Sequence, residues 1–230
     1  MCAKPVVITI DGPAGAGKST VSRLVARRLD FVYLDTGAMY RAVALAAKKN
    51  GVDLEDHQSL GALCDKLDIS FDNTTDPPRI LLDSRDISRE IRTPEIDMLA
   101  SRVSAIKEVR EAMTSLQRKV AAEAGKVVAE GRDMGTVVFP SARWKFFLTA
   151  TLDERARRRY EELIQRGEKI SKSNVAKEMK KRDEQDSNRA LAPLKPADDA
   201  MIIDTTNLSI DQVVNRICDI VDSTISQSQK

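Results

Sequence analysis

Residues 5–29 run from an apolar segment through a glycine-rich loop into a segment of helical periodicity, and this order constrains the fold most strongly. Residues 5–11 are short, apolar and rich in β-branched side chains, which is typical of a strand covered on both faces. Residues 12–19 read GPAGAGKS and match the pattern G-x-x-x-x-G-K-[ST]. Apolar residues then recur at helical spacing from Ser19 to Leu29. Together these features predict a P-loop inside an α/β protein.

Strand-like and helix-like segments go on alternating along the chain. A helix is expected over residues 38–48, and Ser209 with Gln212 forms a capping box that starts the last helix. Four more short apolar strands are expected, at residues 31–35, 126–130, 145–149 and 201–204. Five buried strands separated by helices predict a parallel, doubly wound α/β sheet.

Two stretches interrupt the alternation and divide the expected domain. Residues 67–91 show period-two alternation and a Pro-Pro turn, which predicts a small antiparallel β insert. Residues 152–195 are dense in charge; Thr151 with Glu154 can cap a helix that ends at Gly167, and Ser173 can begin another. Because its apolar content is thin, this stretch is expected to be a mobile helical lid. We therefore expect one P-loop domain, with a core at 1–62, 93–151 and 196–230, an insert at 63–92 and a lid at 152–195.

The glycine-rich loop carries a specific chemistry. Glycines let the backbone wrap a phosphate with its N–H groups turned inward, and the helix that follows adds the positive end of its dipole. Lys18 can reach the β- and γ-oxygens of a nucleotide, and the Ser19 hydroxyl can face Mg²⁺. The loop thus predicts a nucleoside triphosphate, but the acceptor of the phosphoryl group could still be water, a hydroxyl or a second phosphate.

Arginines outside the loop favour a second phosphate, because such an acceptor demands further cations. Arg41 and Arg132 follow predicted strand ends, where ligands of open α/β sheets bind. The lid adds seven arginines: Arg155, Arg157, Arg158, Arg159, Arg166, Arg182 and Arg189. If its second segment is one helix, a single face carries Val175, Met179, Arg182, Asp186 and Arg189. A solvated helix with intrahelical ion pairs is the alternative.

Composition limits the other classes of partner. The 37 basic and 35 acidic residues leave a net charge of +2, which argues against nucleic acid or an anionic membrane as the main partner. No apolar run approaches the roughly 20 residues of a spanning helix. Cys2, Cys64 and Cys218 follow no disulfide or zinc spacing, so they are expected to be reduced thiols of a soluble intracellular protein.

Several longer blocks resemble bacterial cytidylate kinases from Val6 to about Val221. They are ITIDGPAGAGKST, YLDTGAMYRAVAL, SREIRTPEI, AEGRDMGTVVFP, KFFLTA, ERARRR, RDEQDSNRALAPL and IIDTTNLSIDQV. The resemblance implies a nucleoside monophosphate kinase fold with a pyrimidine-binding insert and an arginine-rich lid. It also implies ATP-dependent phosphorylation of CMP and dCMP to CDP and dCDP, by a cytoplasmic monomer that needs Mg²⁺ and has neither nucleic acid nor a membrane as partner.

The resemblance also assigns residues. For the acceptor nucleotide, the phosphate would meet Thr36, Arg41, Arg132 and Arg189, the ribose Arg182 and Asp186, and the cytosine Ser101, Arg110 and Asp133. For ATP the candidates are Gly12, Pro13, Ala14, Gly15, Ala16, Gly17, Lys18, Ser19 and Thr20. The candidate catalytic residues are Lys18, Arg132, Arg155, Arg159 and Arg189. Ser19 replaces a glycine that some members have after the lysine, and it is the candidate metal ligand.

The chemistry of cytosine supports part of this assignment independently. Its N4 amine donates while N3 and O2 accept, so a carboxylate and an arginine together match that edge of the base. Thymidylate, adenylate and dephospho-coenzyme A kinases would share the P-loop and lid, but the set Ser101, Arg110 and Asp133 argues against them. A GTPase would need an Asn-Lys-x-Asp motif, which does not occur. A nucleic-acid ATPase is disfavoured by the near-zero net charge.

Overall fold

The structure is a computed structural model that describes residues 4–228, so Cys2 lies outside the described residues. The chain folds into two compact units. One contains residues 34–125, and the other contains residues 6–33 together with the chain from Lys126 onward. A single-domain organisation with the expected core, insert and lid boundaries stays a prediction.

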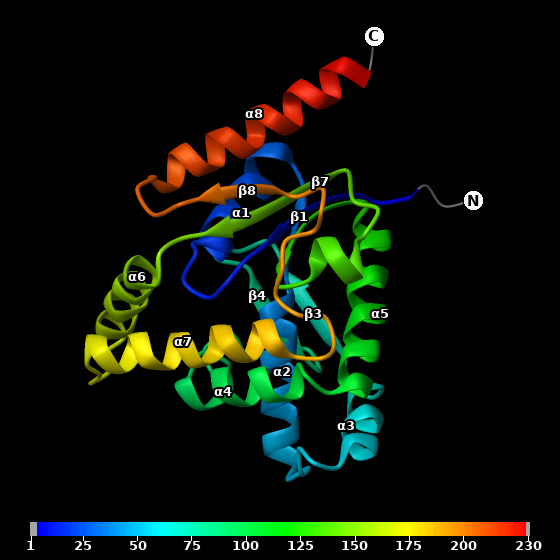
Figure 1. Cartoon of the computed structure of the whole chain (residues 1–230). Coiled ribbons are helices and arrows are strands. Elements are labelled where there is room, and N and C mark those ends of the chain that lie inside the picture. Colours follow the sequence, from blue (N-terminus) through cyan, green and yellow to red (C-terminus); the bar gives the residue numbers. More distant parts are fainter. Residues whose placement is uncertain (1–3, 229–230) are drawn as a thin grey trace. The chain divides into compact units, whose positions relative to one another are not determined.

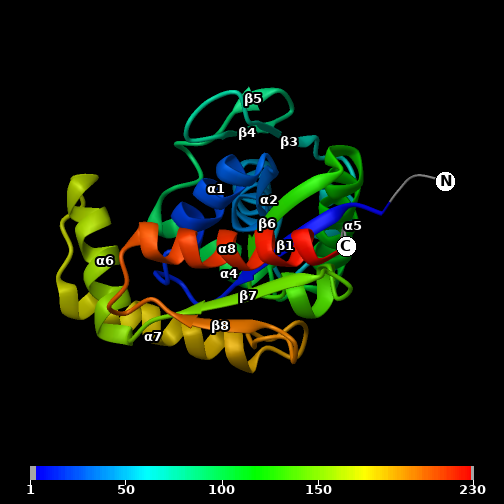
Figure 2. The same cartoon turned by 90° about the horizontal axis from the view of Figure 1, so that it is seen from above.

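A five-stranded sheet carries the expected alternation of strands and helices (Figures 1 and 2). Its strand order is β2-β6-β1-β7-β8, and the pairs β1–β6, β1–β7 and β7–β8 are parallel. The strands are β1 (Val6–Asp11), β2 (Val32–Asp35), β6 (Lys126–Gly131), β7 (Trp144–Thr149) and β8 (Met201–Asp204). All five lie within a residue or two of their expected positions, which confirms the predicted sheet.

Two helices cover one face of this sheet. Helix α1 (Lys18–Leu29) packs against helix α8 (Ile210–Ser228), and both contribute to the main apolar cluster (Figure 2). Ile8 and Ile10 of β1 belong to that cluster and are fully buried, because alternate residues of a strand point to the same face. The predicted capping box is confirmed: Ser209 N donates to Gln212 Oε1 over 2.9 Å, and Gln212 N donates to Ser209 Oγ over 3.2 Å.

The unit containing residues 34–125 is mainly helical. Helix α2 packs against α4, and α3 packs against α5. The helices are α2 (Thr36–Asn50), α3 (His57–Cys64), α4 (Pro94–Val103) and α5 (Lys107–Ala124). The predicted antiparallel insert is confirmed as a three-stranded sheet: β3 (Ile69–Asp72), β4 (Arg79–Leu82) and β5 (Arg85–Asp86).

The charged stretch after β7 folds into two helices, α6 (Leu152–Gln165) and α7 (Lys172–Asn188), which pack together (Figure 1). We call this pair the lid helices. Thr151 caps α6 as predicted, and Gly167 follows the end of that helix with φ 83°. The predicted start of the second helix at Ser173 is wrong, because Ser171 is the N-cap and accepts from Asn174 N over 3.2 Å.

The lid helices also have a small apolar core, which the sequence did not predict. Its buried members are Ala156, Leu163, Val175 and Met179. Ala14 of the glycine-rich loop packs against them. The few apolar residues of the lid helices therefore suffice to form a small core, because Ala14, more than a hundred residues earlier in the sequence, packs against them.

A π-helical turn, η1 (Met134–Val138), follows β6. The sequence analysis placed the segment at a strand end but did not foresee the turn. This turn begins directly after Arg132 and Asp133, so the backbone at these two residues leads from β6 into a π-helical turn.

Candidate active site

Residues 12–17 of the P-loop pattern join β1 to α1, and Lys18 and Ser19 begin the helix, as the pattern predicts. Gly12, Gly15 and Gly17 have φ values of 146°, 74° and 87°, which side chains other than glycine adopt at a cost. At Gly12 the reason for glycine is also steric, because a Cβ atom there would lie 2.0 Å from the Leu148 carbonyl oxygen. The loop and β7 approach each other so closely that no side chain fits between them.

Three carbonyl oxygens of the P-loop accept hydrogen bonds from neighbouring side chains. Lys18 Nζ donates to Pro13 O over 2.8 Å, and Arg155 Nη1 donates to Ala14 O over 3.2 Å. Thr205 Oγ1 donates to Ala16 O over 3.3 Å. Fixing the carbonyls in this way fixes the orientation of the peptide planes, so the N–H groups of the loop stay available for an anion.

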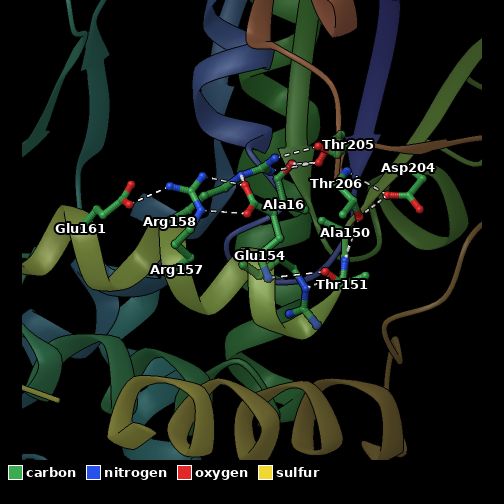
Figure 3. Close-up of polar contacts among 11 residues, drawn as sticks. Ala16, Ala150, Thr151, Glu154, Arg157, Arg158, Glu161, Asp204, Thr205 and Thr206 are labelled. Atoms are coloured by element: carbon green, nitrogen blue, oxygen red, sulfur yellow. Dashed lines mark hydrogen bonds and ion pairs between the residues drawn. The ribbon is translucent and has the colours of Figure 1, made fainter. Parts of the chain in front are cut away.

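Arg158 of α6 strengthens the contact made by Thr205. Its Nη1 and Nη2 atoms donate to the Thr205 hydroxyl and carbonyl over 3.0 and 2.7 Å, and its Nε donates to Glu154 over 2.8 Å. Figure 3 shows Arg158 between Glu154 and Thr205, with Ala16 beside them. The turn after β8, the first lid helix and the P-loop thus share one hydrogen-bond network.

Lys18, the cationic residue of the P-loop, has a strongly lowered pKa. Its side chain is buried, and burial followed by the charge of Arg132 lowers its pKa to about 7 from an ordinary value of 10.5. Glu130 and Asp11 act in the opposite direction but do not outweigh these effects. Lys18 therefore lies in an environment that is short of negative charge, which a polyphosphate would supply.

Ser19 is the first candidate for a metal contact. It lies exposed in the first turn of α1, and its hydroxyl makes no hydrogen bond within the described residues. Among residues 4–228 no group of three or more His, Cys, Asp or Glu side chains could hold a metal ion. The Ser19 hydroxyl fits Mg²⁺, because that ion is commonly held by one or two protein oxygens together with nucleotide phosphates. Thr20, the other predicted ATP contact of this turn, is half-buried.

A cluster of alternating charges joins the end of β6 to helix α7. Arg132 Nε donates to Asp186 Oδ2 over 2.9 Å, and Arg189 Nη2 lies 3.7 Å from Asp133 Oδ1. Burial alone would raise the pKa of Asp186, but the charges of Arg132, Arg182 and Arg189 lower it. The structure thus brings these five predicted residues together. Of the predicted α7 face, Val175, Met179 and Asp186 are buried and Arg182 is half-buried. Arg189 is the C-cap and lies just beyond the helix, so the prediction that it shares the helical face is wrong.

Asp11 is a buried residue of this region that the sequence analysis did not single out. Its carboxylate accepts from Met134 N over 2.9 Å and from Gly135 N over 2.8 Å, so the last residue of β1 anchors the first turn of η1. Burial raises its pKa to about 6, although the two backbone hydrogen bonds act to lower it. The only sequence signal was a carboxylate directly before the P-loop.

Four predicted residues belong to the unit containing residues 34–125. Thr36 is the buried first residue of α2, and Ser101 is half-buried on α4. Arg41 Nη2 donates to Asp35 Oδ2 over 3.3 Å. Arg110 is buried on α5, where its Nη1 donates to Ser104 O over 3.1 Å and its guanidinium lies 5.7 Å from the Tyr40 ring centroid. The β2–α2 junction therefore carries an arginine and a buried hydroxyl, and their role in binding the acceptor phosphate stays a prediction.

The two predicted lid arginines differ in their surroundings. Arg155 is buried and donates to Ala14 O, Ala150 O and Asp183. Arg159 is half-buried, and its Nη1 donates to Glu162 Oε2 over 2.8 Å. Intrahelical pairs such as Arg157–Glu161 and Arg166–Glu162 occupy the more exposed arginines. Such intrahelical ion pairs are the alternative stated above for the segment that forms α7, and they are found here on α6. No helix among the described residues is both long and apolar enough to cross a membrane.

Known proteins resemble this chain over most of its length. The family model "Cytidylate kinase" matches residues 8–223. A cytidylate kinase of Carboxydothermus hydrogenoformans is 50% identical over 214 residues, which cover 93% of this chain and 96% of that protein. One of Vibrio cholerae is 47% identical over 217 residues, which cover 94% and 96%.

A solved structure of an uncharacterized protein from Eubacterium ventriosum supports the fold alone. It is 14% identical, covers 96% of this chain and 99% of its own, and has a TM-score of 0.52. The family match and the two relatives extend over nearly the whole chain and include the P-loop, the charge cluster and the lid helices. On these grounds the chain belongs to the cytidylate kinase family.

Proposed function

We propose that this protein transfers the γ-phosphoryl group of ATP to CMP and dCMP, giving CDP and dCDP. The observation that carries the proposal is the charge cluster of Arg132, Arg182 and Arg189 next to a P-loop whose buried Lys18 has a lowered pKa. A water acceptor is uncharged, so a hydrolase would need no cations to bind its acceptor, whereas an acceptor phosphate needs them. Family membership supplies the identity of the acceptor base.

For phosphoryl transfer the protein mainly has to position the two nucleotides and neutralise the charge of the phosphoryl group. The P-loop N–H groups and Lys18 bind the donor phosphates, and Arg132 and Arg189 bind the acceptor phosphate. Arg155 and Arg159 stabilise the charge on the group in transfer. No general base is needed, because the attacking phosphate oxygen is already ionised near pH 7. Closure of a lid would exclude water from the transfer.

Mg²⁺ is part of the proposal. When bound, it would neutralise charge on the β- and γ-phosphates. Ser19 is the residue that would contact it, through a hydroxyl in the first turn of α1. Lys18 and the loop N–H groups would hold the same phosphates from the protein side.

The residues that bind the acceptor nucleotide are proposed from the family resemblance, and the chemistry of cytosine supports those at the base. Asp133 would accept from the N4 amine of cytosine, Arg110 would donate to N3 or O2, and Ser101 would add a hydroxyl. Thr36 and Arg41 would join the arginines at the acceptor phosphate. Arg182 and Asp186 would bind the ribose.

The decisive experiment is a coupled assay of ADP release with CMP, dCMP, UMP, AMP and dTMP as acceptors. We expect fast turnover with CMP and dCMP and little with AMP or dTMP. ATP consumption that is equally fast without any acceptor would overturn the proposal. Lys18→Ala and Arg132→Ala should abolish turnover, whereas Arg216→Ala, which removes an exposed arginine of α8, should leave it unchanged.

The cellular setting is proposed from family membership and from the near-zero net charge of the chain. We infer a cytoplasmic monomer whose partners are small nucleotides, with neither nucleic acid nor a membrane as ligand. Gel filtration with light scattering tests the monomer, and a dimer at working concentration would contradict it.

A further inference from the structure

Arg155, the buried arginine of α6, is fixed by three acceptors from three separate segments. Its Nε donates to Ala150 O over 2.9 Å, and its Nη1 donates to Ala14 O of the P-loop over 3.2 Å. Nη1 also donates to Asp183 Oδ2 on α7 over 2.6 Å. The position and the plane of this guanidinium are therefore set by the protein before any ligand binds.

One side of that guanidinium stays open. Nη2 makes no hydrogen bond within the described residues, although Nε and Nη1 are both engaged. Since Arg155 lies against the P-loop through Ala14, an oxygen of a P-loop-bound phosphate is the chemical group that fits this remaining donor.

Asp183 has Arg155 as its one ion-pair partner among residues 4–228. It is half-buried, and the side chains of the pair are 20% and 9% exposed, so water screens this ion pair less than an ordinary surface pair. Its second oxygen, Oδ1, is buried and accepts no hydrogen bond in the part of the chain that the structure describes. Burying a carboxylate oxygen without a hydrogen-bond partner costs free energy, and the other oxygen of Asp183 bonds to Arg155. This arrangement points to a role that Asp183 performs through that arginine.

Gly15 of the P-loop lies close to both lid helices. A Cβ atom on Gly15 would lie 2.8 Å from Met179 Cε and 3.0 Å from Arg155 Cβ, so the P-loop packs directly on both lid helices. A small movement of Arg155 would therefore shift Nη2 relative to the bound phosphates.

We propose that Asp183 is a positioning residue for phosphoryl transfer, which holds Arg155 so that its Nη2 meets the phosphate in transfer. This inference rests on the proposed function, because it assigns a partner to one of that reaction's arginines. Asp183 itself touches no substrate. Its contribution is to pre-orient a charge that would otherwise have to be oriented during the reaction.

The test compares Asp183→Asn with Glu184→Gln, a matched control that removes the same charge from the next residue of α7, which is exposed. Arginines that act on a transferring phosphate contribute about 10³- to 10⁵-fold in rate, and loss of orientation should forfeit part of this. For Asp183→Asn we expect kcat to fall by about 10- to 100-fold. The KM for CMP should change by less than about twofold, since the acceptor contacts are intact. Asp183→Glu should recover part of kcat.

A double-mutant cycle with Arg155→Ala separates positioning from a general structural role. If Asp183 acts through Arg155, Asp183→Asn should cause no further loss of kcat in the Arg155→Ala background. Effects that multiply would overturn the inference, as would unchanged kcat in Asp183→Asn. If Asp183→Asn fails to fold, the same cycle is measured with Asp183→Glu in place of Asp183→Asn and is judged by the same criterion. Acceptor-dependent ADP release by the wild type is measured first, so failure of the proposed function is seen separately.

Discussion

Replacement of Gly12 by alanine tests the close approach between the P-loop and β7. The new Cβ would lie 2.0 Å from Leu148 O and 3.0 Å from Leu148 C, and both are backbone atoms of a fully buried strand residue. The φ of 146° adds backbone strain of about 2 kcal/mol, and separating the two segments adds about 2 kcal/mol of overpacking. We therefore expect Gly12→Ala to lower the free energy of unfolding by about 4 kcal/mol.

The matched control is Gly167→Ala, which has φ 83° but no atom within 4 Å of the new Cβ. It should cost only about 1 kcal/mol, for the left-handed backbone. With a urea slope of about 2.5 kcal/mol/M, the unfolding midpoints should fall by about 1.6 M for Gly12→Ala and about 0.4 M for Gly167→Ala. Circular dichroism in urea measures both. If the two variants unfold at the same urea concentration, the steric argument fails.

Three further predictions concern ionisation and metal. Because the pKa of Lys18 is lowered to about 7, this lysine is largely neutral at pH 8.5, and ATP binding should take up nearly one proton. Calorimetry in buffers of different ionisation enthalpy measures this uptake, and Lys18→Arg should show none. The raised pKa of Asp11 means that the folded protein binds its proton more tightly than the unfolded chain does. The free energy of unfolding contributed by Asp11 should thus fall as the pH rises from about 4 to about 6. Urea titrations at several pH values measure this fall, and Asp11→Asn should not show it. Chelation of Mg²⁺ should abolish turnover, and Ser19→Ala should raise the Mg²⁺ concentration for half-maximal rate without changing the KM for CMP.

The strands and the P-loop could be predicted because their signals are local. Residues 6–11 form a β-branched apolar run followed by a glycine pattern, and both features lie within one short window. The capping box at Ser209 is equally local. The start of α7 was misplaced by two residues because Ser171 and Ser173 are both good N-caps, and their hydroxyls lie within 3.0 Å of each other.

What the sequence did not reveal depends on contacts between distant segments. Nothing near Asp11 indicates that its carboxylate accepts from Met134 and Gly135, and nothing near Ala14 indicates that it completes the apolar core of the lid helices. Family resemblance named Arg155 without its partner, because Asp183 lies on another helix. The predicted assignments of individual residues to CMP and ATP stay predictions until the variants are measured.

The central position of β1 has a consequence for how the chain folds during synthesis. Val6 pairs with Lys126 on one side, and Ile8 pairs with Trp144 on the other, so both neighbours of the first strand are translated long after it. At roughly 5–20 residues per second, the ribosome needs on the order of 10 s to produce them. Residues 34–125 form a compact unit that is complete before β6 is made, so it can fold first. Until β6 and β7 are translated, Val6–Asp11 is an apolar segment without its strand partners, so the central sheet forms late in synthesis.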